Sequence, residues 1–210
     1  MSRKRPHALQ RGRRTPIVMV SSSVFGLEPV LDQIYAALKG YGYEVWMSHK
    51  GTMPTDPRLS NFDNCLKAVE KCDVFLGLIT ARYGSGREGS GRAITHREIL
   101  RAIKKEKVRW FLVHRDVDVA RQLLKQFRFH SDGSRRKLDF QPTPVLQDIR
   151  VLEMYEAALR HDLPPPRRTG NWVHPFSTPE DALRFIEAQF ADVRRVRELL
   201  RRRSPSRRSK

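Results

Sequence analysis

The segment DVFLGLIT, residues 73–80, runs from an acidic residue to a threonine through six consecutive apolar or glycine residues. A strand that faces water on one side alternates apolar and polar residues, whereas a strand covered on both sides does not. The segment therefore predicts a central strand, buried on both faces, in a parallel sheet that helices cover from two sides.

Similar apolar segments recur along the chain on both sides of this strand. Residues 16–21, 43–48 and 108–114 predict three more strands, because they are short and rich in branched or aromatic residues. Strand and helix alternate four times, which predicts an α/β fold with a mainly parallel, flavodoxin-like sheet flanked by helices. The helices are predicted from apolar residues at helical spacing over 28–39, 61–71, 95–105 and 116–127.

Composition divides the chain into four parts. Residues 1–14 predict a disordered basic arm and residues 15–127 the α/β domain. Residues 128–193 predict a mostly helical C-terminal extension that packs on the same domain. Residues 194–210 predict a basic tail, because Ser, Pro and Arg favour disorder.

The extension has its own pattern of elements. Residues 128–144 are predicted to form an irregular segment or a hairpin, and residues 145–160 a helix. Residues 172–176 are predicted to form either a short strand or an anchoring loop. Thr178, followed by Asp181, predicts a capped last helix that runs into the basic tail.

The chain of 210 residues carries a formal net charge of +18. Residues 1–14 contribute +6 and residues 194–210 contribute +8, so most of the excess is at the two ends. Between them, residues 82–137 hold 16 basic and 6 acidic side chains. This segment is interpreted either as a solvated basic face or as a surface for phosphate, nucleotide or nucleic acid.

Several classes of protein find no support in the sequence. No apolar run reaches the roughly 18–20 residues that a membrane helix needs, and no apolar segment typical of a signal peptide follows the basic N-terminus. We therefore expect a cytoplasmic protein that does not contact the membrane.

Cys65 and Cys72 lie seven residues apart in a predicted helix, and we interpret them as core thiols or inert surface thiols. No metal motif, Walker motif or nucleophile elbow is present, and glycines 84, 86 and 89 are a weak dinucleotide signal.

Ligands of open parallel sheets bind beyond the carboxyl ends of the strands. That rule selects residues 21–25, 49–50, 80–85 and the helix start at 95–98. These segments would bring hydroxyls, cations, an aromatic ring and one carboxylate, Glu98, to one rim. Such a set suits a ribose phosphate, because hydroxyls and helix N-termini bind phosphate and a carboxylate can act at the anomeric carbon.

Each of these residues also has a purely structural interpretation. Glu98 lies three residues after Thr95, which predicts a capping box with Thr95 as the N-cap. His96 is expected to face solvent. Arg82 and Tyr83 could anchor a loop, and residues 21–23 could simply end a strand.

Three motifs resemble a bacterial TIR-like family, domain of unknown function 4062. In that family a strand ends in a Ser-Ser turn followed by Phe and Leu-Glu. A later strand opened by Asp ends before Arg-Tyr-Gly, and the next helix begins with Ile-Thr-x-x-Glu. The resemblance covers roughly residues 16–115, and the matching residues are Ser22, Ser23, Phe25, Leu27, Glu28, Asp73, Arg82, Tyr83, Gly84, Ile94, Thr95 and Glu98.

The resemblance implies kinship with TIR domains and nucleoside deoxyribosyltransferases. In both groups a Glu at the start of the helix after the third strand acts on an N-glycosidic bond, and Glu98 matches that position. The resemblance implies NAD as a possible substrate. From the residues themselves we expect no metal, and we expect no cofactor. The residues expected to bind substrate are Ser22, Ser23, Phe25, Arg82, Tyr83, Gly84 and Thr95.

Three functional hypotheses remain open at this point. The first is an NAD glycohydrolase that acts in bacterial antiviral defence or signalling. The second is a non-catalytic TIR-like module that assembles with itself or with a partner protein, in which Glu98 is only structural. The third is a nucleic-acid-associated protein that contacts polyanions through its basic ends.

Overall fold

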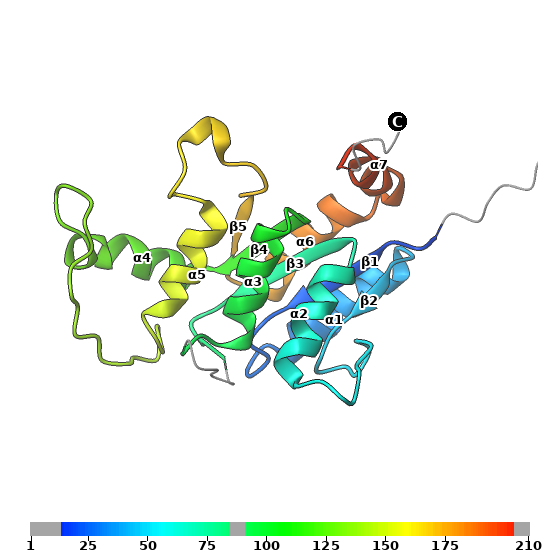
Figure 1. The fold of residues 1–210 in the computed structure, drawn as a ribbon, viewed down its shortest axis with the longest axis horizontal. Coiled ribbons are helices and arrows are strands. Elements are labelled where there is room, and N and C mark those ends of the chain that lie inside the picture. The colour runs from blue at the N-terminus through cyan, green and yellow to red at the C-terminus, as the bar shows by residue number, and fades with distance from the viewer. Residues whose placement is uncertain (1–13, 85–90, 204–210) are drawn as a thin grey trace, which may run out of the picture.

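The computed structural model describes residues 14–84 and 91–203. Within this part of the chain a five-stranded parallel sheet has the order β2-β1-β3-β4-β5 (Figure 1). This arrangement confirms the predicted α/β, flavodoxin-like fold. The strands are β1 (Ile17–Ser21), β2 (Glu44–Trp46), β3 (Val74–Ile79), β4 (Val108–His114) and β5 (Val173–Phe176).

Strand β3 lies at the centre of the sheet and is buried along its whole length, as its sequence predicts. Its side chains alternate between two apolar clusters, with Leu76 facing one and Phe75 facing the other. Gly77 faces the second cluster, where the ring of Phe111 on β4 occupies the space that a side chain would need. A Cβ atom at position 77 would lie 2.8 Å from that ring, so glycine is required for close packing of β3 on β4.

Helices cover both faces of the sheet (Figure 1). One apolar cluster joins the sheet to α1 (Glu28–Gly40), α6 (Pro179–Phe190) and α7 (Val193–Arg203). The other joins it to α2 (Asn61–Lys71), α3 (Ile94–Lys104) and α5 (Arg150–Leu159), together with the start of α4 (Arg115–Arg128). Burial on two sides explains why the central strand carries no polar alternation.

Residues 173–176 form a strand parallel to β4, which confirms one of the two alternatives predicted for 172–176. Two other parts of the C-terminal chain differ from their prediction. The helix predicted over 145–160 begins only at Arg150. Residues 193–203 form α7, with Val196 fully buried, although composition predicts a basic tail for most of this range.

The predicted cap of α6 is confirmed. The Thr178 hydroxyl accepts a hydrogen bond from the backbone of Asp181, whose carboxylate accepts one from the backbone of Thr178. The basic segments at 1–13 and 204–210 lie outside the described residues. No helix in the described ranges is long and apolar enough to cross a membrane.

Candidate functional site

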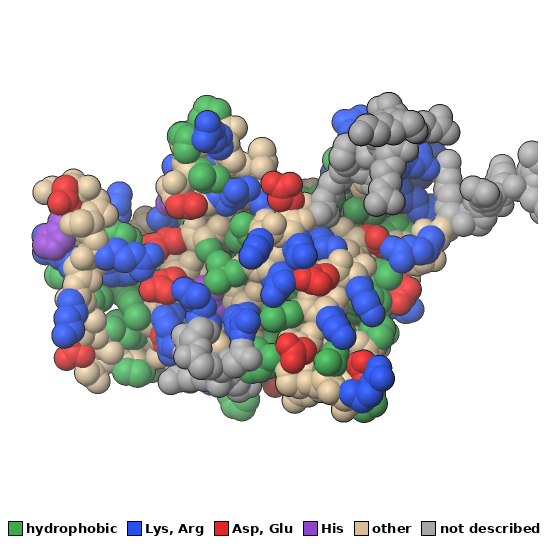
Figure 2. All heavy atoms as spheres, in the orientation of Figure 1, with side chains coloured by type: hydrophobic (Ala, Val, Ile, Leu, Met, Phe, Trp, Pro, Cys, Tyr) green, Lys and Arg blue, Asp and Glu red, His purple; other side chains and the backbone are tan. Residues whose placement is uncertain are grey.

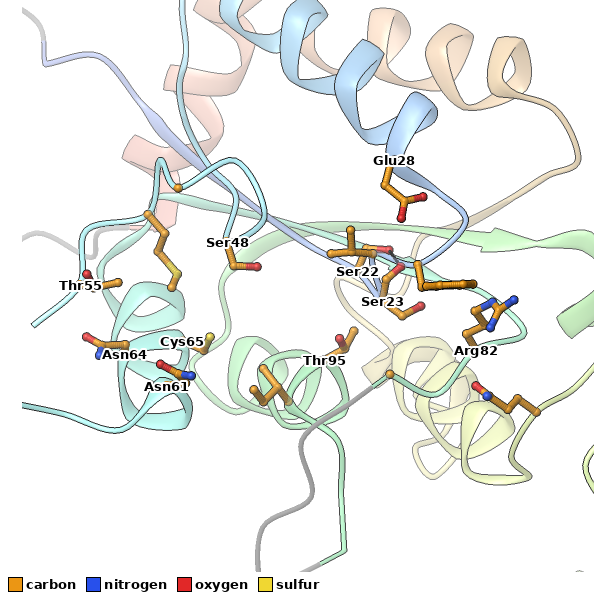
Figure 3. A pocket seen from close by; sticks show the side chains of 17 residues that line it. Ser22, Ser23, Glu28, Ser48, Thr55, Asn61, Asn64, Cys65, Arg82 and Thr95 are labelled. Atoms are coloured by element: carbon orange, nitrogen blue, oxygen red, sulfur yellow. Dashed lines mark hydrogen bonds between the residues drawn. The ribbon is translucent and has the colours of Figure 1, made fainter. Parts of the chain in front are cut away.

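A cavity of about 870 Å³ lies beyond the carboxyl ends of β1 and β3, where the parallel sheet predicts a ligand site (Figure 3). Its walls come from the turn after β1, the loop after β2, the start of α2, the turn after β3 and the start of α3. Ten of the seventeen lining residues carry polar or charged side chains. They include the hydroxyls of Ser22, Ser23, Ser48, Thr55 and Thr95, the amides of Asn61, Asn64 and Gln147, and the charged groups of Glu28 and Arg82.

The two serines after β1 lie at the centre of this cavity, as Figure 3 shows. The Ser23 hydroxyl lies 3.0 Å from the Thr80 hydroxyl, so one hydrogen bond joins the turns after β1 and β3. The Ser22 hydroxyl donates to the carbonyl of Ser23 at 3.0 Å. These two bonds hold the turns in register, and Ser22 remains half-buried at the cavity surface.

Glu98 lies on the buried face of α3, and the prediction that it caps this helix is wrong. Helix α3 begins at Ile94, its N-cap is Ala93, and no side chain caps it. Thr95 and Glu98 therefore both point inward. Their burial against β1 and α2 stabilises the protein more than a local helix cap would. The Ser21 hydroxyl donates a hydrogen bond of 2.5 Å to Oε2 of Glu98.

Burial raises the pKa of Glu98 from 4.5 to about 7, while hydrogen bonds from Ser21 and the Cys65 thiol act to lower it. The same burial raises the pKa of Cys65 to about 12, so this thiol stays protonated and donates. Glu98 lines a small polar cavity of about 40 Å³, which shares Ser22 and Thr95 with the main one. Glu98 therefore does not line the main cavity; its carboxylate, with a pKa of about 7, lines the small cavity that adjoins it.

Tyr83 does not line the cavity. Its side chain is buried, and its hydroxyl lies 2.7 Å from Nδ1 of His96. The Arg150 guanidinium covers the ring at 4.4 Å from the ring centre. Tyr83 therefore supports the turn after β3 from behind, and Arg150 occupies the position over its ring that a base would need.

His96 is buried, which contradicts its expected exposure to solvent. Burial, together with Arg92 and Arg150, lowers its pKa to about 4. The imidazole is therefore neutral at pH 7 and serves as a hydrogen-bond partner for Tyr83.

Phe25 and Arg82 form the exposed edge of the cavity. The Arg82 guanidinium lies 4.3 Å from the centre of the Phe25 ring, and 69% of Phe25 is exposed. Gly84 lines the same wall with a φ of +90°, a conformation that favours glycine. The rest of the predicted glycine-rich loop, residues 85–90, lies outside the described residues.

The predicted rim residues His49 and Lys50 lie apart from the main cavity. The Lys50 ammonium lies 2.5 Å from the Asp32 carboxylate on α1, so this cation is paired within the protein. His49 lines only the small cavity next to Glu98.

Several lining residues are not predicted from the sequence, and Asn64 shows why. Its side-chain amide bonds the backbone of Asp56 in both directions, at 2.7 and 3.0 Å, which fixes the loop after β2. Asn64 is a buried polar residue on the inner face of α2, where helical periodicity favours an apolar one. A polar residue at such a position is a signal from which a lining residue could be predicted. Gln147, more than 60 residues later, gives no such signal.

A family model described as a domain of unknown function, DUF4062, matches residues 17–164. The chain belongs to the DUF4062 family. The matched range includes every residue that lines the two cavities beside Glu98, while β5, α6 and α7 follow it. No curated protein matches this DUF4062 chain.

The DUF4062 site offers hydroxyl, amide and guanidinium groups, the carboxylate of Glu28 in the main cavity and that of Glu98 in the small one. No group of three or more His, Cys, Asp or Glu side chains in the described residues could hold a metal ion. The hydroxyl, amide and guanidinium groups of the site can hold sugar hydroxyls and phosphate oxygens, and a carboxylate can place negative charge near an electron-poor carbon.

Proposed function

We propose that this DUF4062 protein binds NAD or a related ribosyl nucleotide in the main cavity and cleaves its N-glycosidic bond. The observation that supports this proposal is the position of Glu98, which has a pKa of about 7 and lines a small cavity that shares Ser22 and Thr95 with the main one. A cavity of about 870 Å³ falls in the range of small-molecule sites, about 300–1,000 Å³.

The exposed edge would bind the outer parts of the nucleotide. The open face of the Phe25 ring can stack on a base, and the Arg82 guanidinium behind it can bind phosphate oxygens. Ser22, Ser23 and Thr95 would then face the ribose nearest Glu98.

In this proposal the bond between C1′ of the ribose and the pyridinium nitrogen breaks. Its electron pair goes to the ring nitrogen, so nicotinamide leaves as a neutral molecule and needs no proton. The ionised carboxylate of Glu98 stabilises the positive charge that develops at C1′. Water then adds to C1′ and loses a proton, giving ADP-ribose.

The burial of Glu98 favours a second candidate, a non-catalytic assembly module. Only 5% of Glu98 is exposed, and its carboxylate already accepts hydrogen bonds from within the protein. In that case the Ser21–Glu98 pair joins β1 to α3, and the protein acts by association with itself or a partner.

The direct test follows nicotinamide release from NAD by the full-length protein, with Glu98→Gln as the variant and Glu187→Gln on the exposed side of α6 as the matched control. We expect Glu98→Gln to reduce release at least 100-fold and the control to leave it unchanged. No release by the wild type would refute the glycohydrolase proposal, and equal release by Glu98→Gln would remove Glu98 from the mechanism. Sedimentation of the same variants tests the assembly module, which predicts unchanged association.

The biological setting proposed here follows from the resemblance to TIR-like proteins. We place the reaction in bacterial antiviral defence or signalling in the cytoplasm, where loss of NAD would be the output. Measuring cellular NAD after infection, in cells that carry the wild type or Glu98→Gln, tests that setting.

A further inference from the structure

A second large cavity, of about 830 Å³, lies on the α2/α3/α5 side of the sheet and shares no lining residue with the first. It is enclosed by the C-terminal half of α3, by α4, by the turn at residues 129–135 and by α5. On the face that α3, α4 and α5 form, Figure 2 shows Lys and Arg side chains beside hydrophobic ones, with acidic side chains among them.

The floor of this cavity is apolar, and four cations and three carboxylates also line it. Leu100 and Ile103 of α3 meet Phe129 and Ala157 on the floor. A surface of this kind suits a flat apolar group such as a nucleobase. The rim carries Arg121, Lys125, Arg135 and Arg160.

Three carboxylates line the cavity, those of Glu153, Glu156 and Asp162, and the first two are paired with arginines. Glu153 lies 3.0 Å from the Arg135 guanidinium. Glu156 pairs at 2.5 Å with Arg128, which is almost fully buried. Glu153 and Glu156 therefore neutralise Arg135 and Arg128. In the rest of the lining three cations, Arg121, Lys125 and Arg160, face one carboxylate, Asp162.

The remaining cations have weaker partners. Arg121 is 3.8 Å from Asp118, and its buried Nε has no hydrogen-bond partner among the described residues. Arg160 donates to the carbonyl of Thr169, and Lys125 makes no ion pair within the described ranges. Three cations from α4 and the end of α5 thus converge on one opening.

The lining histidine His161 experiences the resulting positive field. Burial lowers its pKa, and the charges of Arg121, Arg168 and Lys125 lower it further. A positive potential that disfavours a second proton on His161 favours an anion at the same place.

We propose that this cavity is a second ligand site, specific for a nucleoside polyphosphate. Its phosphates contact Arg121, Lys125 and Arg160, and its base lies on the apolar floor beside Phe129. The volume accommodates a molecule of this size. Because Glu153 and Glu156 occupy Arg135 and Arg128, the phosphates would bind the three cations outside these pairs, which defines the ligand's orientation. This proposal does not depend on the function proposed for the first cavity.

The test is calorimetric titration of ATP into the full-length protein, in an Arg82→Gln background that weakens the first cavity. The variant is Lys125→Gln combined with Arg160→Gln. The control is Lys39→Gln combined with Lys67→Gln, which removes the same charge from exposed positions on α1 and α2. We expect the cavity variant to weaken ATP binding at least tenfold and the control to change it less than twofold.

Two part-ligands separate the contributions of the phosphates and the base. We expect tripolyphosphate to bind at least fivefold more weakly than ATP, and adenosine to bind far more weakly still. Equal binding of tripolyphosphate and ATP would overturn the role of the apolar floor. Absence of ATP binding, or equal losses in the variant and the control, would overturn the site.

The chosen variants avoid confusion with misfolding. Arg121 stacks on the Tyr155 ring at 5.1 Å, so its replacement would also disturb packing of α4 on α5. Lys125 is exposed, so Lys125→Glu serves as a single variant that reverses one rim charge. We expect it to weaken ATP binding with the melting temperature unchanged, and unaltered affinity in a folded Lys125→Glu protein would contradict the proposal.

Discussion

Ser21, the last residue of β1, donates a hydrogen bond of 2.5 Å to the buried carboxylate of Glu98 on α3, 77 residues later in the chain. This pair joins the central sheet to the helix that forms the floor of the main cavity. The bond favours the ionised form of Glu98 against the effect of burial, so Ser21 controls how Glu98 titrates.

Replacing Ser21 by Ala removes a bond that lowers the pKa of Glu98. If the ionised carboxylate is the active form, the acid limb of the rate of NAD cleavage against pH shifts to higher pH. We expect a shift of about one pH unit, with the rate at high pH largely kept. A Ser23→Ala variant is the matched control, because Ser23 bonds Thr80 rather than Glu98, and an acid limb unmoved in Ser21→Ala would contradict the assigned role.

The raised pKa of Glu98 also makes stability depend on pH. Its folded value of about 7 exceeds the ordinary 4.5, so the protonated form is favoured by folding. This contribution of Glu98 to the free energy of unfolding is complete below pH 4.5 and is lost as the pH rises through 7. Glu98→Gln should therefore gain about 3 kcal/mol relative to the wild type between pH 4.5 and 8, measured by urea unfolding, whereas a constant difference would show that Glu98 titrates normally.

Phe25 tests whether the exposed edge of the main cavity binds a base. Removing the ring in Phe25→Ala should raise the KM for NAD about tenfold with little change in kcat, because stacking contributes about 1–3 kcal/mol. Since 69% of Phe25 is exposed, the melting temperature should hardly change. Trp172→Ala removes a comparably exposed ring outside the cavity, and an equal effect of both substitutions would argue against stacking.

Gly77 tests the packing of the central sheet. A Cβ atom there would lie 2.8 Å from the Phe111 ring, so Gly77→Ala should lower the free energy of unfolding by about 1–3 kcal/mol. A methyl group at Gly40, at the end of α1, would have nothing within 4 Å, so Gly40→Ala should be neutral or slightly stabilising. Denaturant unfolding measures the free energy of unfolding of both variants. A Gly77→Ala protein as stable as the wild type would contradict the prediction.

The apolar periodicity predicted most of the architecture correctly. The strands around 17–21, 74–79 and 108–114, and the helices between them, lie where branched apolar runs and helical spacing place them. This works because each pattern records how an element buries its side chains, whatever its neighbours are. The rule that ligands bind beyond the strand ends then directed attention to Ser22, Ser23 and Arg82, all of which line the cavity.

Local patterns misled the prediction where a side chain had a distant partner. Thr95 and Glu98 have the spacing of a capping box, yet α3 starts one residue before Thr95 and turns both inward. Tyr83 lies next to the cavity-lining Arg82 in sequence, but Arg150 and His96 hold its ring in the protein interior.

Chain order and apolar spacing were thus enough to specify an α/β sheet covered by helices, the rim at which the main cavity lies, and the concentration of positive charge at the ends. Only the tertiary structure decided that Glu98 is buried under Ser21 with a pKa near 7, that Tyr83 is covered by Arg150, and that cations from α4 and α5 surround a second cavity. The physical reason is that burial of a carboxylate and convergence of charges depend on contacts between residues tens of positions apart, whereas periodicity reports only which face of each element is apolar.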